Sequence, residues 1–317
     1  MHPTPSTTIA TPVSIRDVGL RDGLQSLASI VSTPNKCEWI DAAYNAGIRE
    51  MEVGSMVPAR LLPQLADTEA VLAHALTKPG LIATVLVPNL KGAERALAAR
   101  AHVMILPLSA SHAHSLANLR KTPDDAVAEV ARIRAARDAA GCNTLIEGGI
   151  STAFGCTLQG DVAESEVLRL MQALLDAGAD HVSLADTVGF ADPESVRRLF
   201  EKARRLVGDK LRGAHFHDTR GMGLVNAYSA WQTGITHLDA CIGGIGGCPH
   251  APGASGNVTT EDLAYMLQRM GVDTGLNVPA LLQLRERMQS WLPGEALHGS
   301  LWQAGVIATQ SKQAVAA

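Results

Sequence analysis

HVSLADTVGFADPESVRRLFEKARRLVGDKLRGAHFHD, residues 181–218, holds two short β-rich segments separated by a segment with helical periodicity. In the middle segment, 192–208, apolar residues recur with a period of 3.6, and an Asp-Pro pair at its start and a glycine at its end are suitable caps. The flanking segments, 181–187 and 212–218, have the length and composition of strands. The stretch therefore predicts one strand–helix–strand unit, the element from which α/β folds are built.

The same alternation runs along the rest of the chain. Helical periodicity returns at 123–141, and further helices are expected at 259–271 and 277–291, after the last strand. An open, doubly wound sheet would show the same alternation. Eight units without a change of composition between the halves favour an α/β fold with one (β/α)₈ TIM barrel and additional C-terminal helices. The eight predicted strands are 13–20, 50–55, 81–89, 102–109, 144–152, 181–187, 212–218 and 237–243.

Length and composition agree with a single large domain. Hydrophobic residues make up 46% of the 317 residues and aromatic residues only 3%, so the core is expected to consist mainly of Ala, Val, Leu and Ile. The opening segment lacks the charged and apolar regions of a signal peptide and the arginines of a mitochondrial presequence. We expect one catalytic domain at 13–306, between flexible tails at 1–12 and 307–317.

Charge, hydropathy and cysteine usage exclude several classes of protein. The formal net charge is −4 and no basic run is long enough to follow a phosphate backbone, so nucleic acid is not an expected partner. No apolar stretch approaches the roughly 18 residues of a membrane-spanning helix, and no membrane association is expected. The five cysteines include no C-x-x-C pair, which argues against a disulfide framework or zinc ribbon and favours a cytoplasmic location.

Charged residues occur near the C-terminal ends of three predicted strands. Arg21 and Asp22 follow the first, Glu52 lies near the end of the second, and Asp186 ends the sixth. A single carboxylate at such a position is often only a helix cap or the partner of an arginine. In TIM barrels, however, catalytic residues gather at this end of the strands, and the convergence favours a site.

The segment AHFHD, 214–218, offers two histidines on one strand. His215 and His217 are two residues apart and therefore point to the same side. Each alone would more often be a packing residue, but two on one face favour metal ligands. Asp22 would add an oxygen, giving a nitrogen and oxygen set without thiolate that suits Mg²⁺ or Mn²⁺, with Co²⁺, Fe²⁺ or Zn²⁺ as alternatives.

The glycine-rich segment GGIGGCPHAPGASGN, 243–257, does not bind phosphate in the manner of a Walker loop. No Lys-Ser/Thr pair follows it, and Pro249 and Pro252 prevent an immediate helix start. We expect a mobile loop that closes over the site and carries Cys248 inward as an acid or base. The alternative is that Cys248 is a buried, inert thiol.

Three blocks resemble the HMG-CoA lyase family: GLRDGLQS at 19–26, HFHDTRGMGLVNA at 215–227 and GGIGGCPHAPGASGNVTTEDLAYML at 243–267. VPNLKG at 87–92 and LADTVG at 184–189 extend the similarity, which spans roughly 13–277. The resemblance implies retro-aldol cleavage of 3-hydroxy-3-methylglutaryl-CoA, or of a related branched 3-hydroxyacyl-CoA, to acetyl-CoA and an oxo acid. It also implies a divalent metal, an acyl-CoA thioester as substrate, and a homo-oligomer.

The resemblance also implies roles for individual residues. Metal ligands would be Asp22, His215, His217 and Asn257. Catalytic residues would be Arg21, which faces the thioester carbonyl, Cys248, Glu52, Asp186 and His215, while Gln25 lies where the family keeps a polar side chain near the substrate.

The chain departs from the family pattern mainly in loops that face the substrate. Ser26, Leu27 and Ala28 replace polar and cationic residues after RDGLQ, and Arg220 stands where the family has tyrosine. In SASHAHSLAN, 109–118, the pair His112 and His114 replaces a glutamate and an aromatic residue. We interpret His112, His114 and Arg220 as residues that reshape the acyl or CoA pocket; the alternative for the histidines is a solvated loop.

Three other functions compete with HMG-CoA cleavage. One is a lyase for another acyl-CoA, such as citramalyl-CoA. Another is a Claisen-type synthase of the same superfamily, although such enzymes lack this cysteine loop and carry further C-terminal domains. The last is a catalytically silent barrel, against which the presence of Arg21 and of every metal-ligand position argues.

Overall fold

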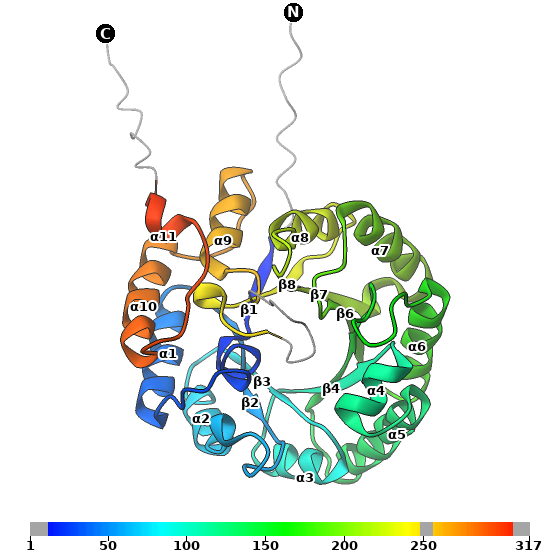
Figure 1. Cartoon of the computed structure of the whole chain (residues 1–317). Helices are drawn as coiled ribbons and strands as arrows, with labels where there is room; N and C mark the ends of the chain where they lie inside the picture. The colour runs from blue at the N-terminus through cyan, green and yellow to red at the C-terminus, as the bar shows by residue number, and fades with distance from the viewer. Residues whose placement is uncertain (1–11, 248–255, 307–317) are drawn as a thin grey trace, which may run out of the picture.

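Eight parallel strands form a closed barrel in the order β1-β2-β3-β4-β5-β6-β7-β8 (Figure 1). The computed structural model of the chain describes residues 12–247 and 256–306. This architecture confirms the predicted TIM barrel and excludes the open sheet, because β8 pairs with β1. The strands are β1 (Ser14–Asp17), β2 (Glu50–Ser55), β3 (Ile82–Leu86), β4 (Val103–Ser109), β5 (Leu145–Ser151), β6 (His181–Asp186), β7 (Leu211–Phe216) and β8 (His237–Ala240).

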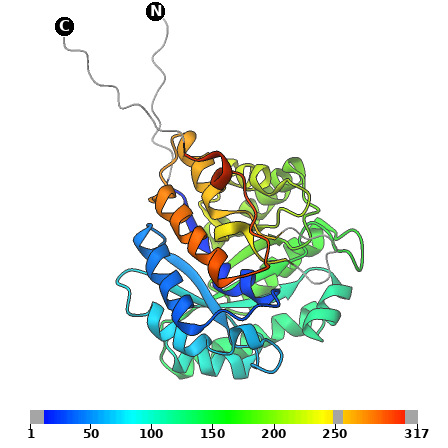
Figure 2. The ribbon, with the colours of Figure 1, turned by 60° about the vertical axis from the view of Figure 1, so that its left-hand side comes forward.

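Helices surround the barrel as an outer ring (Figure 1). After β8 the described chain adds further helices, as expected, and the longest of these, α10, packs beside α1 (Figure 2). Among the described residues, no helix is long and apolar enough to cross a bilayer. The helices are α1 (Thr33–Asn45), α2 (Thr68–Ala75), α3 (Leu90–Ala98), α4 (His112–Leu119), α5 (Pro123–Ala139), α6 (Glu164–Asp176), α7 (Pro193–Val207), α8 (Gly223–Gln232), α9 (Thr260–Arg269), α10 (Val278–Trp291) and α11 (Leu301–Ala304).

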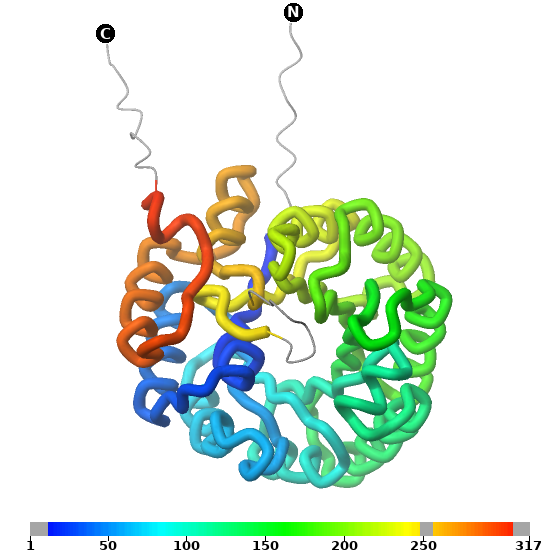
Figure 3. Tube along the Cα trace, in the orientation of Figure 1, coloured from blue at the N-terminus to red at the C-terminus, as the bar shows by residue number. Residues whose placement is uncertain are grey.

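The pairing of β1 with β8 brings the first and last strands of the barrel side by side (Figure 3). Arg16 lies opposite Asp239 in this pairing, and the Val18 amide donates to the Ala240 carbonyl at 2.9 Å just beyond the strand end. Segments that are more than 200 residues apart in sequence therefore meet at the mouth of the barrel. The predicted tails, 1–12 and 307–317, lie outside the described residues apart from Pro12.

The apolar core lies mainly between the strands and the helices. Trp39, Phe200 and Phe216 are fully buried there, and the last two belong to a cluster of aromatic rings with Phe154. Inside the barrel, where branched aliphatic side chains usually predominate, this chain buries charged groups. These are Arg16, Glu50, Glu52 and Glu147, with the partly exposed Asp239 and Arg212 beside them.

Helix α7 begins and ends almost where the sequence predicts. Asp192 is its N-cap and accepts from the amides of Glu194 and Ser195, while the Ser195 hydroxyl takes part in a reciprocal capping box. Gly208 terminates the helix with a φ of +56°, in the left-handed region that glycine adopts without strain. Local sequence thus determines both ends of this helix.

The first predicted strand, 13–20, is too long. The strand ends at Asp17, and Gly19–Gly23 forms a single π-helical turn in which the Val18 carbonyl accepts from the amides of Arg21, Asp22 and Gly23. The apolar residues of this segment are buried by the turn rather than by strand pairing. Periodicity alone does not distinguish these two forms of burial.

Replacement of the α7 cap tests whether this helix depends on local capping. Asp192→Ala removes the acceptor of two backbone amides, and we expect the free energy of unfolding to fall by about 1 kcal/mol. Urea denaturation followed by circular dichroism measures this change. The control is Asp209→Ala, an exposed aspartate just beyond the other end of α7 for which the described residues supply no hydrogen bond; equal destabilisation by both variants would contradict the prediction.

Candidate functional site

The candidate site lies at the C-terminal ends of the strands and begins with the π-helical turn after β1. Close packing shapes this turn, because a Cβ atom at Gly19 would collide with the Trp39 ring and one at Gly23 would lie 2.9 Å from Ile245. Below the turn, Asp17 accepts from the Trp39 indole N–H at 2.8 Å and from the Gly19 amide at 3.1 Å. The turn is thereby anchored to α1, and it carries Arg21 and Asp22.

Asp22, His215 and His217 form the three-residue centre of the site. Their ligand atoms lie within 4.8 Å of one another, with Asp22 and His217 buried. Asp22 Oδ2 is 3.3 Å from His217 Nε2 and 3.9 Å from His215 Nε2. The structure confirms the predicted proximity of the two histidines and Asp22. The cluster is a candidate site for a divalent cation.

Hydrogen bonds at the far side of each ring orient both histidines. His217 Nδ1 donates to the Thr187 carbonyl at 2.8 Å, since a carbonyl only accepts. His215 Nδ1 lies 3.1 Å from Asp239 Oδ2 and donates to that carboxylate. Both imidazoles therefore carry the proton on Nδ1 and present Nε2 to Asp22, which is how metal-binding histidines are commonly held.

Asn257 completes the donor set from the chain that follows β8. It pairs with His217 through an isolated antiparallel bridge, and its Nδ2 donates to Asp22 Oδ2 at 2.8 Å and to the Ile245 carbonyl at 3.0 Å. Its Oδ1 is buried without a hydrogen-bond partner. A buried acceptor with no donor, next to a carboxylate and two imidazoles, fits a divalent cation that prefers oxygen and nitrogen ligands.

Arg21 bridges Asp22 to a second carboxylate, Glu52. Arg21 Nη1 donates to Asp22 Oδ1 at 2.5 Å, and Arg21 Nε lies 2.7 Å from Glu52 Oε1 as an ion pair that is out of line for a hydrogen bond. Gln25 Nε2 also donates to Asp22 Oδ1, at 3.0 Å. Two of the residues predicted to share the site, Arg21 and Gln25, thus contact Asp22. The third, Glu52, joins them through Arg21.

The two carboxyl groups around Arg21 have opposite pKa shifts. Burial raises the pKa of Glu52 to about 7, because the attraction of Arg21 only partly offsets the lost solvation. Burial acts in the same direction on Asp22, but Arg21 and the two histidines outweigh it and hold the pKa of that carboxyl well below its usual range. The site therefore pairs a permanent carboxylate with a carboxyl group that exchanges a proton near neutral pH.

Asp186 is turned toward the loop that follows β6. Its Oδ1 accepts from the Phe190 amide at 2.9 Å and its Oδ2 from the Ala191 amide at 3.0 Å. Because Thr187, in the same loop, accepts from His217, Asp186 supports the orientation of that ring. Its predicted catalytic role stays a prediction.

The residues predicted to line the substrate pocket take different positions. His112 is exposed at the start of α4, whereas His114 is buried with Nδ1 2.7 Å from the Ser109 hydroxyl. Arg220 donates to the Val188 and Gly189 carbonyls and lies over the Phe190 ring, so it braces the β6–α7 loop. Their contact with a substrate stays a prediction, and Cys248 lies outside the described residues.

Sequence reasoning missed three charged residues of this region, two of them buried and one, Asp239, partly exposed. Arg16 and Asp239 lie inside the barrel beneath the histidines, and Glu261, in α9, accepts from the Gly243 amide and pairs with Arg285. A charged residue within an apolar strand segment, as in HLDACIG at 237–243, is the signal that would have identified Asp239. Glu147 was noted only as a departure, yet it is an interior partner of Arg16.

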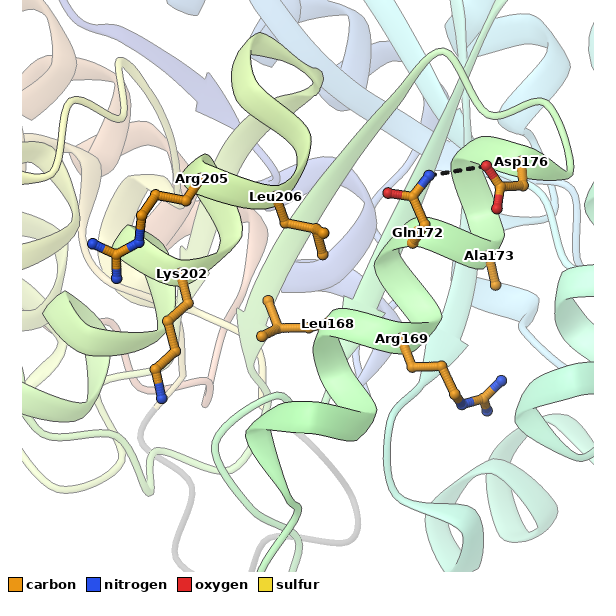
Figure 4. A pocket seen from close by; sticks show the side chains of 8 residues that line it. All are labelled: Leu168, Arg169, Gln172, Ala173, Asp176, Lys202, Arg205 and Leu206. Atoms are coloured by element: carbon orange, nitrogen blue, oxygen red, sulfur yellow. Dashed lines mark hydrogen bonds between the residues drawn. The ribbon is translucent and has the colours of Figure 1, made fainter.

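A groove of about 760 Å³ elsewhere on the surface is not this site (Figure 4). It is formed entirely by α6 and α7, on the outer ring, and no residue from a strand end contributes to it. Its lining residues are Leu168, Arg169, Gln172, Ala173, Asp176, Lys202, Arg205 and Leu206.

An eight-stranded α/β barrel with an aspartate, two histidines and an asparagine converging at its mouth defines the class of barrel enzymes with a candidate divalent-metal site. Within that class, the chain belongs to the HMGL-like family, whose sequence profile matches residues 12–288. The resemblance to the HMG-CoA lyase family and the prediction of a carbon–carbon lyase are thereby confirmed.

Named relatives and solved structures agree with this assignment. The chain is 36% identical to the hydroxymethylglutaryl-CoA lyase of Bacillus subtilis, over 90% of this chain and 96% of the relative. It is 36% identical to the human mitochondrial hydroxymethylglutaryl-CoA lyase, over 87% and 84%. The structure of an HMG-CoA lyase from Acinetobacter baumannii in complex with coenzyme A and 3-methylmalate superposes with a TM-score of 0.90 at 37% identity, covering 95% of this chain and 98% of that one.

The raised pKa of Glu52 predicts how stability depends on pH. Because this pKa moves from 4.5 to about 7 on folding, the folded protein holds a proton between these values that the unfolded chain has lost. Stability therefore falls as the pH rises through this window. Asp17 and Glu261, whose pKa values burial also raises, contribute in the same direction.

Glu52→Gln should make this fall shallower, because the neutral amide does not titrate. Thermal unfolding in the presence of a chelator, between pH 5 and pH 7.5, measures the slope. Glu286→Gln, an exposed glutamate in α10, is the control. A slope in Glu52→Gln as steep as in the parent protein would contradict the assignment.

Proposed function

We propose that this chain is a metal-dependent lyase that cleaves 3-hydroxy-3-methylglutaryl-CoA, or a closely related branched 3-hydroxyacyl-CoA, to acetyl-CoA and an oxo acid. For HMG-CoA the oxo acid is acetoacetate. The observation that carries the proposal is the convergence of Asp22, His215, His217 and the partnerless Asn257 Oδ1. It occurs in a chain that is 36% identical to hydroxymethylglutaryl-CoA lyases over most of its length.

The donor set supports Mg²⁺ or Mn²⁺ as the cofactor. It consists of two imidazole nitrogens, a carboxylate and an amide oxygen, without thiolate. These groups would hold a divalent cation, which when bound would supply a lower pKa for the substrate hydroxyl and a fixed orientation for a chelating substrate.

Different residues of the chain have different roles in the reaction. A base beside the substrate removes the proton from the 3-hydroxyl group, and the bond between C2 and C3 breaks as C3 becomes a ketone. Asp22 is the candidate for this base; His215 could take the role only with its Nε2 free of the cation, because its Nδ1 already carries a proton. The electron pair moves onto the thioester as an enolate. Arg21, which stays cationic, stabilises the enolate oxygen. Cys248 then supplies a proton to C2, which yields the acetyl thioester.

Glu52 supports Arg21 in this scheme. With a pKa of about 7, it exchanges a proton near neutral pH beside the guanidinium group. When ionised it holds the arginine in position, and when protonated it leaves the full cationic charge for the enolate. The matching of a carboxyl pKa to the working pH is typical of acid–base sites.

A shorter acyl group is the second candidate. The Acinetobacter baumannii relative was solved with coenzyme A and 3-methylmalate, a four-carbon hydroxy diacid with a methyl branch. The same retro-aldol step on 3-methylmalyl-CoA yields propionyl-CoA and glyoxylate, and on citramalyl-CoA it yields acetyl-CoA and pyruvate. The substitutions at His112, His114 and Arg220, together with the loss of polar residues at 26–28, favour an altered acyl pocket.

We further propose a cytoplasmic, homo-oligomeric enzyme. Relatives from rat and human are named cytoplasmic, although others are named mitochondrial. Trp302 in α11 and Val306 just after it are exposed, and a subunit contact would cover them. Light scattering coupled to gel filtration measures the mass of the assembly.

Parallel assays with HMG-CoA, citramalyl-CoA and 3-methylmalyl-CoA test the proposed function. We expect cleavage of at least one thioester with Mg²⁺ or Mn²⁺, and none after chelation. The free acids acetoacetate, pyruvate and glyoxylate identify the substrate. His217→Ala and Cys248→Ala should abolish turnover, whereas His74→Ala, on the outer face of the ring, should not. Failure of metal-loaded protein to cleave any of the three would overturn the proposal.

Arg21→Lys tests the stabilisation of the enolate. Lysine keeps the charge but loses the fork that contacts Asp22 and Glu52 together, and we expect kcat to fall by about 10²–10³-fold with a smaller change in KM. Steady-state kinetics with the preferred thioester measure both constants. An unchanged kcat would show that Arg21 has no part in the transition state.

A further inference from the structure

We propose that Asp239 is a positioning residue for His215, holding its Nδ1–H so that Nε2 remains directed toward Asp22 and a bound divalent cation. This inference rests on the proposed function, because it assigns a role toward the cation of the same site. Asp239 does not belong to the ligand set and lies beneath it, inside the barrel.

The register of the barrel produces this arrangement. In the pairing of β2 with β1, Glu50 lies opposite Arg16. In the pairing of β1 with β8, Arg16 lies opposite Asp239. In the pairing of β8 with β7, Asp239 lies opposite His215. Acidic and basic side chains therefore alternate across four neighbouring strands. Closure of the barrel between β1 and β8 is what makes Arg16 and Asp239 neighbours.

Arg16 fixes the Asp239 carboxylate from the side opposite to His215. Its Nε donates to Asp239 Oδ1 at 2.8 Å and its Nη2 to Oδ2 at 3.0 Å, a two-point contact that sets the plane of the carboxylate. The other edge of the guanidinium group binds Glu147, at 3.0 and 3.1 Å. In the carboxylate held in this way, Oδ2 has a further lone pair, which accepts from His215 Nδ1 at 3.1 Å.

The donor and acceptor roles then fix the tautomer of His215. Arginine only donates and an ionised carboxylate only accepts, so the proton between Asp239 and His215 belongs to Nδ1. In the neutral imidazole the lone pair then lies on Nε2, which is 3.9 Å from Asp22 Oδ2. The Thr187 backbone carbonyl orients His217 in the same way. A side-chain substitution does not remove a backbone carbonyl. Asp239 is thus the orienting group that mutagenesis can reach.

Net charge is the competing explanation for any effect of Asp239 on metal binding. In the ion-pair cluster around Arg16 and Arg212, these two guanidinium groups face three carboxylates, Glu50, Glu147 and Asp239. Glu52, also inside the barrel, pairs with Arg21 instead. The excess of one negative charge favours the binding of a cation nearby. Loss of any of the three carboxylates removes this excess charge. A control must therefore remove the same charge without touching His215.

Asp239→Asn and Glu50→Gln form such a pair. Asparagine keeps the shape but offers an amide N–H to His215 Nδ1, which favours the tautomer with the proton on Nε2. Glutamine at 50 removes an equal charge from the same cluster, where Glu50 is 3.5 Å from Arg16 and 2.7 Å from Arg212. Calorimetric titration with Mn²⁺ should show affinity about 10- to 100-fold weaker in Asp239→Asn, with a much smaller change in Glu50→Gln. Equal weakening in both would overturn the positioning role.

Nitrogen NMR of the imidazoles separates the tautomer from stability. With ¹⁵N-labelled histidine and Mg²⁺, parent His215 should be protonated on Nδ1, and Asp239→Asn should shift it toward Nε2 protonation. An unprotonated Nδ1 in the parent protein would overturn the proposal even if the variant failed to fold. These readouts need no substrate, so failure to cleave an acyl-CoA would count against the proposed function alone.

Discussion

Closure of the barrel between β1 and β8 is the constraint on which the rest of the structure depends. The four residue pairs of this contact join the start of the described chain to its last strand. Asp22 follows the first strand of the pair and Asn257 follows the second, and they meet at 2.8 Å. Without closure, Asp22 would not join the histidines at the mouth and Arg16 would not meet Asp239, because these partners lie 195 and 223 residues apart in the sequence.

Burial of charge inside the barrel is the second consequence of closure. Taking Arg16 and its carboxylate partners out of water has a large desolvation cost, which well-placed ion pairs offset only in part, so a buried pair of this kind is weak support for stability. Its clearer effect is geometric. One edge of the Arg16 guanidinium group binds Asp239 and the other binds Glu147. Asp239, oriented in this way, is the carboxylate that contacts His215. The interior thus serves the orientation of the site above it.

The candidate site was largely predictable from the sequence where its residues are close in sequence to a strand end. Arg21, Asp22, His215 and His217 follow from strand alternation and from the i, i+2 rule, and the structure brings them together. Asp239 and Arg16 were not predictable in the same way, since a charged residue in a short apolar strand indicates neither its partner nor its depth. Asp186 shows the converse: its place at a strand end was right, but only the structure shows that both of its oxygens serve loop amides.

The order of the elements followed from the sequence, because helical and strand periodicities are local properties that a window of roughly a dozen neighbouring residues expresses. The sequence by itself also determined the ends of α7 through the cap at Asp192 and the glycine at 208, and the glycine-rich blocks placed the chain in its family. Tertiary structure alone decided which residues are neighbours across the barrel. The length of the first strand, the tautomers of the two histidines and the pairing of Arg16 with Asp239 all depend on contacts between segments far apart in sequence, and no local pattern encodes such distances.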